Sequence, residues 1–271
     1  MLKSIINKYL IEQELQTGQV ALLFSSGMDS LSILLSCLEV GVKPKLYTFY
    51  LDNHESEDIR RSREISKILN LDLKEIVINT HKINLESDVY SIVKTFKTKR
   101  KTAIQCIHPF LYVIPNITEK YILTGLCADD LYGTARSITK VGNNYEKFNE
   151  VRLKKVKDET ASSYCYIKNI AEEHGKVFLA PYKENQEIIN YMLRLNYKEL
   201  NSPKQKNVMY EDYKDILEKY KIYRRNSNLQ CDSKIREWHD TLLENKNINV
   251  KNNKSVVAIY NRIYKEVFDG R

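Results

Sequence analysis

The sequence lacks the long apolar stretches that mark membrane-spanning or exported proteins. None of its apolar runs approaches the roughly 20 residues that a transmembrane helix needs. The first residues place Lys3, Lys8, Glu12 and Glu14 between apolar positions, which predicts an amphipathic helix over 1–17. A signal peptide would instead have an uninterrupted apolar core. We therefore expect a cytoplasmic protein that has no membrane partner.

Cysteine and histidine are few, with five residues of each in 271. The cysteines are odd in number, widely spaced and without a C-x-x-C pair: Cys37, Cys106, Cys127, Cys165 and Cys231. The histidines show no spacing typical of metal ligands either. These patterns exclude a disulfide framework and a zinc site. A bound metal would therefore be held by carboxylates, which favour a hard ion such as Mg²⁺.

The charge is biased toward basic residues but is not concentrated. Lysine and arginine number 43 against 35 acidic residues, so the formal net charge is +8. This balance fits a polyanionic partner, whether a nucleotide or a nucleic acid. The densest basic cluster, KTFKTKRK at 94–101, is expected to be a solvated loop or helix end.

Strand and helix patterns alternate in the first half of the chain. Short apolar runs predict strands at 20–25, 45–51, 73–78, 120–124 and, more weakly, 177–179. Apolar residues at helical spacing predict helices at 29–40, 55–69, 103–113, 184–195, 207–220 and 235–244. Strands separated by helices indicate an α/β fold with a doubly wound parallel sheet. We expect an α/β domain over 18–200, a helical C-terminal part over 201–271, and polar loops at 140–149 and 245–255.

The most informative segment follows the first predicted strand and reads FSSGMDSL at 24–31. Small residues between a strand and a helix let backbone N–H groups approach an anion, and the helix dipole favours negative charge there. Ser25 and Ser30 add hydroxyl donors, whereas Asp29 suits a phosphate site only if it binds the magnesium that bridges the phosphates. The alternative is an ordinary turn and helix cap. A Walker A motif is absent from the sequence.

This segment resembles the S-G-G-x-D-S motif of the PP-loop ATP pyrophosphatases in five of six letters, with Ser26 replacing the first glycine. The resemblance implies an adenine nucleotide alpha hydrolase-like fold. It also implies cleavage of ATP between its α- and β-phosphates, adenylation of a substrate and release of pyrophosphate. Serine is less free than glycine at positive φ, so the exchange should alter the loop.

A second segment, LTGLCADDLYG at 123–133, resembles S-G-E-G-x-D-E-x-F-G-G of the asparagine synthetase synthetase domain. Segments 102–112, 180–195, 204–208 and 224–235 resemble further parts of that domain in the same order. The resemblance implies that Asp29 and Asp129 bind Mg²⁺ and that Lys206 and Asp29 are catalytic. The residues that it assigns to ATP and pyrophosphate are Ser25, Ser26, Gly27, Asp29, Ser30, Thr48, Phe49, Gly125 and Lys206.

Other interpretations of these residues stay open. Lys206 is one of many lysines and could be an ordinary solvated residue. Asp129 and Asp130 could form a helix cap, and His108 before Pro109 is expected to be structural. Cys127 has no histidine beside it in the sequence, which argues against a nucleophilic role.

Three departures from the asparagine synthetase pattern concern the substrate. Residue 2 is leucine rather than a nucleophilic cysteine, so no glutaminase domain is expected and the nitrogen must come from solution or from an amine-supplying partner protein. Leu126 stands where the family has a catalytic glutamate. Met209 and Tyr210 replace a Leu-Arg pair.

The leading hypothesis is therefore an ATP-dependent carbon–nitrogen ligase with Mg²⁺ that adenylates a small-molecule carboxylate and forms an amide. One alternative is a PP-loop enzyme that adenylates a tRNA or DNA base, which the net charge favours. The other is a degenerate protein that binds nucleotide without turnover, which the exchanges at Ser26 and Leu126 keep open.

Overall fold

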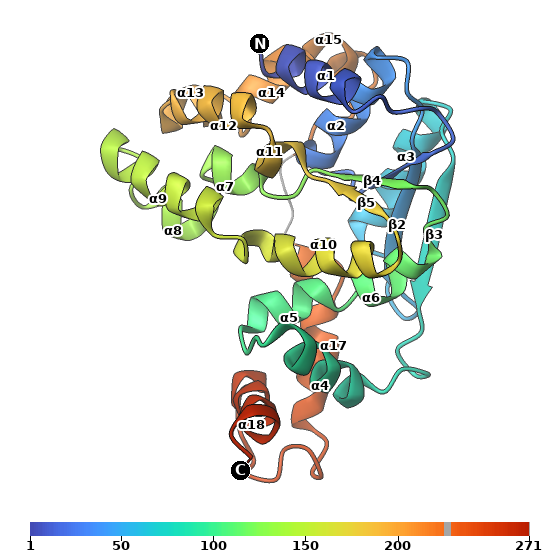
Figure 1. Ribbon diagram of the computed structural model, residues 1–271, viewed down its shortest axis with the longest axis vertical. Coiled ribbons are helices and arrows are strands. Elements are labelled where there is room, and N and C mark those ends of the chain that lie inside the picture. The colour runs from blue at the N-terminus through green and yellow to red at the C-terminus, as the bar shows by residue number, and fades with distance from the viewer. Residues whose placement is uncertain (225–228, 271) are drawn as a thin grey trace.

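Five parallel strands form one sheet in the computed structural model, which describes residues 1–224 and 229–270 (Figure 1). The strands are β1 (Val20–Leu23), β2 (Lys45–Leu51), β3 (Leu73–Ile78), β4 (Tyr121–Thr124) and β5 (Val177–Leu179). Their order is β3-β2-β1-β4-β5, so the winding direction reverses between β1 and β4. Open α/β sheets bind ligands outside the carboxyl ends of their strands at such a reversal. The prediction of a doubly wound parallel sheet is confirmed.

The two faces of the sheet are covered by different helices because successive strand residues point to opposite sides. In β1, Val20 and Leu22 join one apolar core, whereas Ala21 and Leu23 join the other. The first core is built with α1 (Leu2–Glu12), α2 (Met28–Glu39) and α3 (Glu57–Ile68). It also receives α7 (Ala128–Tyr132), α8 (Arg136–Thr139), α9 (Tyr145–Lys157), α11 (Pro181–Glu184), α12 (Gln186–Leu193), α13 (Tyr197–Asn201), α14 (Asn207–Asp212) and α15 (Lys214–Lys219).

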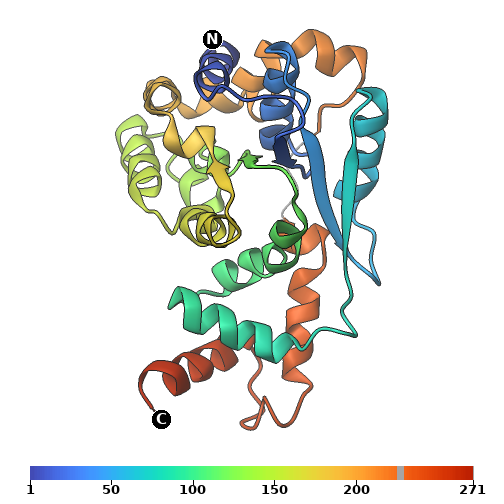
Figure 2. The ribbon, with the colours of Figure 1, turned by 45° about the vertical axis from the view of Figure 1, so that its right-hand side comes forward.

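The second core holds the helices drawn in the middle and lower part of Figure 1. They are α4 (Leu85–Phe96), α5 (Lys101–Ile107), α6 (Phe110–Val113), η1 (Ile114–Asn116), α10 (Tyr164–Glu173), α17 (Ile235–Asp240), η3 (Thr241–Leu243) and α18 (Val256–Phe268). The short elements η2 (Ala161–Ser163) and α16 (Leu229–Asp232) adjoin them. The N-terminus lies at the top of Figures 1 and 2 and the C-terminus at the bottom. No described helix is long and apolar enough to cross a membrane.

Several predicted elements differ in detail from the structure. The loop expected over 140–149 is wrong in its second half, because Asn144 caps α9 by accepting from the Lys147 amide and Phe148 is buried. The helix expected over 207–220 is divided at Tyr213 into α14 and α15. That over 103–113 is divided before Pro109 into α5 and α6. Helices α4, α10 and α18 were not anticipated, whereas the N-terminal amphipathic helix is confirmed as α1.

Candidate functional site

The turn from β1 into α2 forms a compact anion-binding geometry. Gly27 is the N-cap of α2, and no side chain caps that end of the helix. Ser25 and Ser30 close the loop, since the Ser25 amide donates to Ser30 Oγ at 3.3 Å and Ser30 Oγ donates to the Gly27 carbonyl at 3.1 Å. Ser26 has a left-handed φ of 55°, the conformation for which the motif normally uses glycine. The first turn of α2 therefore leaves its amides free of side-chain caps at the sheet edge.

The turn from β4 into α7 lies directly against this loop. A Cβ on Gly125 would come within 2.5 Å of the Asp29 carbonyl carbon and 2.7 Å of the Ser30 nitrogen, so only glycine fits there. Cys127 has a φ of 69°, again at a position where the resembled motif has glycine. Because both backbones meet without side chains between them, Asp29 and Asp129 face the same space.

Lys206 joins these two carboxylates. Its Nζ lies 2.5 Å from Asp29 Oδ1 and 2.8 Å from Asp129 Oδ1, and its side chain is only 1% exposed. The residue is left-handed at φ 59°, and its amide donates to Asn201 Oδ1 at 3.2 Å. Burial alone would lower the pKa of Lys206, but the charges of Asp29 and Asp129 outweigh it and raise that pKa. Lys206 is therefore a buried ammonium between two acids, which corrects the alternative of a solvated surface lysine.

These residues border a cleft of about 670 Å³ at the carboxyl edge of the sheet. Most of the residues predicted for nucleotide and metal line it: Ser25, Gly27, Asp29, Ser30, Thr48, Phe49, Gly125 and Asp129. Ser26 and Lys206 lie just behind the surface, and the buried Oγ of Ser26 has no hydrogen-bond partner among the described residues. The structure thus brings the residues predicted from the sequence together around one cleft. The side chain of Ser26 does not line this cleft.

The cleft has two sides, which we name by their elements. The β2 side consists of Ser25, Gly27, Ser30, Thr48 and Phe49. The α10 side consists of Thr102, Cys106, Leu126, Asp130, Ser162 and Ile167, from α5, the start of α7, η2 and α10. They meet where the rings of Phe49 and Phe110 pack edge to face with centroids 6.4 Å apart.

Sequence reasoning missed the pairing of Asp130 with Ser162 on the α10 side. Asp130 is 6% exposed, and its Oδ2 accepts from Ser162 Oγ at 2.9 Å. Burial raises the pKa of Asp130, while the Ser162 hydroxyl and the charge of Lys155 partly offset this. Ser162 and Ser163 are consecutive left-handed residues at φ 49° and 61°. Such backbone strain concentrates at functional sites, but it has no signature in the sequence.

The opposite rim is formed by α3 and the segment before α17. Asp58 pairs with Arg224, and both Ser56 and Ser233 line the cleft. Residues 225–228 lie outside the described residues, so the resemblance over 224–235 is seen only at its two ends. The position of Ser56 and Asp58, directly after β2, is the signal that could have found them, because β2 ends at the ligand-binding edge.

The donor set fits a hard cation beside phosphates. Asp29 and Asp129 supply two carboxylates from different loops, and no group of three or more His, Cys, Asp or Glu side chains that could hold a metal occurs among the described residues. Mg²⁺ commonly uses one or two protein carboxylates and completes its shell with water and phosphate oxygens. The two carboxylates share the Lys206 ammonium instead of a metal ion in this structure, which is consistent with that mode.

Residues with other expected roles lie outside this chemistry. His108 is fully buried between Asp88 and His239, and its ring stacks on Trp238. Cys127 borders the cleft, but burial raises the pKa of its thiol, which disfavours the reactive thiolate. Burial likewise raises the pKa of Cys106 to about 11.

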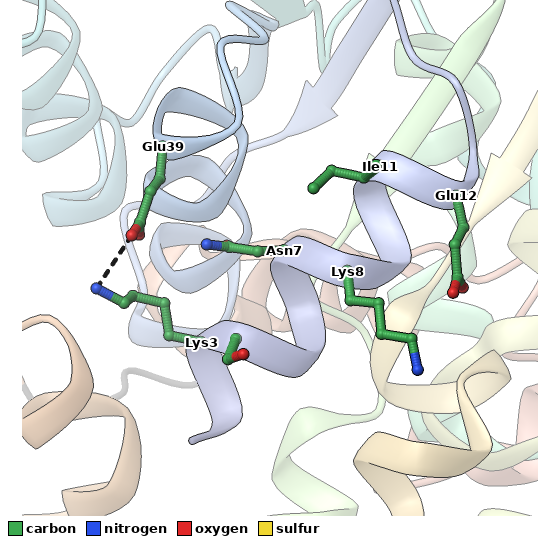
Figure 3. A pocket seen from close by; sticks show the side chains of 7 residues that line it. Lys3, Asn7, Lys8, Ile11, Glu12 and Glu39 are labelled. Carbon is green, nitrogen blue, oxygen red and sulfur yellow. Dashed lines mark ion pairs between the residues drawn. The ribbon is translucent and has the colours of Figure 1, made fainter.

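A second hollow lies on the outer surface of α1 and is unrelated to these residues (Figure 3). It has a volume of about 570 Å³ and is lined by Ile11 and by polar and charged side chains of α1, together with Glu39. Lys3 and Glu39 pair across it at 3.2 Å, and none of the predicted site residues faces it. The cleft at the sheet edge is therefore the better candidate.

Comparison with known proteins agrees with the motifs. The family model for asparagine synthase matches residues 10–240 of the chain. No curated protein sequence matches the chain. Among solved structures, a predicted subunit of tRNA methyltransferase from Methanocaldococcus jannaschii is similar at 13% identity and a TM-score of 0.38, covering 79% of this chain and 94% of that one. The U34-tRNA thiolase NcsA from Methanococcus maripaludis, solved with its 4Fe-4S cluster, has 13% identity and a TM-score of 0.35, covering 97% and 78%.

Proposed function

Because the chain belongs to the asparagine synthase family, a family of ATP-using PP-loop enzymes, we propose that it is an ATP-dependent carbon–nitrogen ligase. It adenylates a substrate carboxylate, releases pyrophosphate and forms an amide with ammonia or an amine. The observation that carries this proposal is the meeting of Asp29, Asp129 and Lys206 at the point where the sheet reverses direction. This set supplies carboxylates for a metal and a cation for a leaving phosphate group.

ATP binds along the β2 side of the cleft in this proposal. Thr48 and Phe49, at the end of β2, receive the adenine. The Gly27 amide and the hydroxyls of Ser25 and Ser30 face the phosphates at the start of α2. The next residue of β2, Tyr50, does not line the cleft and instead packs under the Arg63 guanidinium.

Asp29 and Asp129 would hold Mg²⁺, which supplies charge neutralisation to the phosphates when bound. The oxygen of the substrate carboxylate attacks the α-phosphorus, and the bond to the β-phosphate breaks. Lys206, whose ammonium lies beside both carboxylates, would neutralise the departing pyrophosphate as a compact point charge. Its burial keeps water away, so its electrostatic effect is stronger than at the surface.

An amine then attacks the acyl carbon, AMP leaves, and the nitrogen gives up one proton. Leu126 lines the cleft where the family has a catalytic glutamate, so that residue cannot take the proton. The α10 side, on which Leu126 replaces the family glutamate, faces this step.

The test is magnesium-dependent pyrophosphate release from ATP, screened with aspartate and other carboxylates in the presence of ammonium. We expect release with a carboxylate, and we expect Asp29→Ala to abolish it. The matched control is Glu39→Ala at the opposite end of the same helix, which should keep the full rate. ATP binding without release for every acceptor would instead support a degenerate nucleotide-binding protein.

A second candidate function, modification of a nucleic acid, is favoured by a basic rim on the α10 side. Lys97, Lys99 and Arg100 are exposed in the segment before α5, and Lys154 and Lys157 are exposed at the end of α9. Arg100 donates to Thr160 at 2.9 Å, which joins these segments beside η2. Thr102 and Ser162, from the same elements, line the cleft.

This candidate predicts that bulk tRNA binds and stimulates pyrophosphate release. The affinity should fall steeply with salt, because each neutralised phosphate releases counterions. Charge reversal of Lys97 and Lys99 should make the slope of log affinity against log salt concentration less steep, by the amount expected for the loss of about one to two phosphate contacts. Release with a free carboxylate and no tRNA binding would reject this candidate in favour of the ligase.

A further inference from the structure

Asp130 is a buried carboxylate of the cleft to which the proposed ATP chemistry assigns no role. It lies on the α10 side, and only 6% of its surface is exposed. Each of the other carboxylates that line the cleft has a cation: Asp29 and Asp129 share Lys206, and Asp58 pairs with Arg224. Among the described side chains, no lysine, arginine or histidine forms an ion pair with Asp130, so its charge lacks a direct counterpart.

Lys155 and Lys183 act on Asp130 through their charge alone, without a described hydrogen bond or ion pair to it. Lys183 donates to the carbonyls of Val156 and Asp158 and pairs with Glu159 at 3.2 Å. The hydroxyl of Ser162 is the only described side chain that donates to Asp130. A buried carboxylate is costly unless cations or several donors satisfy it, and one neutral hydroxyl is a weak compensation.

The backbone around Ser162 is arranged to hold this contact. Ser162 and Ser163 both take left-handed conformations that non-glycine residues avoid. The turn joins η2 to α10 and places Ser162 Oγ 2.9 Å from Asp130. Ile167 and Cys106, from α10 and α5, also line this side of the cleft and make part of it apolar. An acid and a hydroxyl beside an apolar wall form a site for a small organic cation rather than for a hydrated metal ion.

We propose that Asp130 and Ser162 form a subsite for a protonated primary amine, with the alkyl part of the ligand against Cys106 and Ile167. The amine nitrogen donates a charge-assisted hydrogen bond to Asp130. It lies beside the Ser162 hydroxyl, which donates to the same carboxylate. Two sources share this chemistry: an amino group on the adenylated carboxylate substrate, or the amine that attacks the adenylate. Which source applies rests on the proposed ligase function, whereas the existence of the subsite does not.

The binding test uses the full chain and two simple probes, n-propylammonium and its neutral isostere n-propanol, followed by saturation-transfer NMR. We expect a signal for propylammonium with wild type, a signal at least fivefold weaker with Asp130→Asn, and none for propanol. Glu119→Gln is the matched control, because Glu119 is a buried carboxylate outside the cleft and its variant should bind like wild type.

Ser162→Lys provides a second variant that does not remove a buried group. Ser162 is exposed, and a lysine there would place its own ammonium against Asp130 and displace the probe. Equal propylammonium signals for wild type, Asp130→Asn and Ser162→Lys would overturn the proposal. No signal with wild type, or an equal signal for propanol, would also overturn it.

The source of the amine is read from two assays once a turning-over acceptor is known. If the amino group belongs to the carboxylate substrate, Asp130→Asn raises the KM of that substrate about tenfold in ATP–pyrophosphate exchange. If it belongs to the attacking amine, exchange is unchanged and only the amine KM in amide synthesis rises. In either case kcat should change less than threefold. Absence of pyrophosphate release with all acceptors would reject the ligase but leave the binding result valid.

Discussion

The two sides of the cleft differ in how closely they follow the asparagine synthetase pattern. The β2 side keeps Ser25, Gly27 and Ser30 in a tightly bonded turn, and its one exchange, Ser26, retains the backbone conformation that the motif needs. The α10 side replaces the family glutamate by Leu126 and carries the Asp130–Ser162 pair. Under the proposed function, the comparison teaches that ATP binding is constrained by backbone geometry, whereas the choice of acceptor is set by exchangeable side chains.

Removal of Lys206 should produce the largest effect. Lys206→Met leaves Asp29 and Asp129 without their shared cation. We expect the free energy of unfolding to fall by about 3 kcal/mol, since breaking a buried ion pair leaves uncompensated charge. Pyrophosphate release should fall about 10²- to 10³-fold. Chemical unfolding and a pyrophosphate assay measure the two effects.

The control for Lys206 is Lys204→Met, two residues earlier, where the ammonium lies over the Tyr210 ring outside the cleft. Addition of Mg²⁺ should recover part of the stability of Lys206→Met, because the ion can replace the ammonium between the carboxylates. Release within threefold of wild type in Lys206→Met would remove this lysine from the proposed mechanism.

The contact between the two loops is tested next by Gly125→Ala. The new Cβ would lie 2.5 Å from the Asp29 carbonyl carbon, so backbone must move to accommodate it. We expect a loss of about 2 kcal/mol in unfolding free energy, as for other overpacked positions, and at least a tenfold weaker ATP affinity by calorimetry. Gly175→Ala has nothing within 4 Å and should change stability but not ATP affinity. Normal ATP binding by Gly125→Ala would mean that the two loops need not touch.

The sequence predicts the β2 side of the cleft better than it predicts the α10 side. The strands, their parallel arrangement and the candidate carboxylates Asp29 and Asp129 were predicted because apolar runs and loop motifs are local signals, whereas the strand order was not. The contact of Lys206 with both carboxylates depends on Asn201 and a left-handed turn 177 residues from Asp29, which no local pattern encodes.

The contact between Asp130 and Ser162 on the α10 side was missed for a related reason. Asp130 meets Ser162 across 32 residues, and Ser162 lies in a strained turn with an unremarkable sequence. Helices α4 and α18, which support α5 from below, were also not anticipated. Side chains that tertiary packing brings together are visible to sequence reasoning only through a family pattern, and Ser162 and Ile167 lie outside the segments that resemble the family.

Acid should weaken the α10 side before the β2 side. Behind α5, His108 bonds to Asp88 and to His239, which bonds to Tyr260 of α18. Burial, then the charges of His108 and Lys101, holds the pKa of His239 well below its usual value. The folded protein therefore binds fewer protons than the unfolded chain below pH 6.5, and stability is lost as the pH falls.

The expected loss is about 1 kcal/mol between pH 6.5 and 5.5, and it continues at lower pH until the pKa of folded His239 is reached. Unfolding curves at several pH values measure it, and His239→Gln should flatten the dependence in this range. Hydrogen exchange should show α17 and α18 opening before α2. A stability that rises on acidification, or an unchanged slope in His239→Gln, would contradict this assignment.

The smallest effect concerns the left-handed residues that replace family glycines. Ser26→Gly and Cys127→Gly should each relieve about 1 kcal/mol of backbone strain, partly offset by the greater freedom of glycine in the unfolded chain. Each variant should therefore gain only about 0.5 kcal/mol in unfolding free energy. Ser26→Gly also removes a buried hydroxyl that has no partner among the described residues, so its gain should be the larger. If the β2 side is fixed by backbone alone, Ser26→Gly should keep the ATP affinity of wild type. A loss of affinity would show that the serine side chain itself takes part, and the contrast between the two sides of the cleft would be weaker than their geometry indicates.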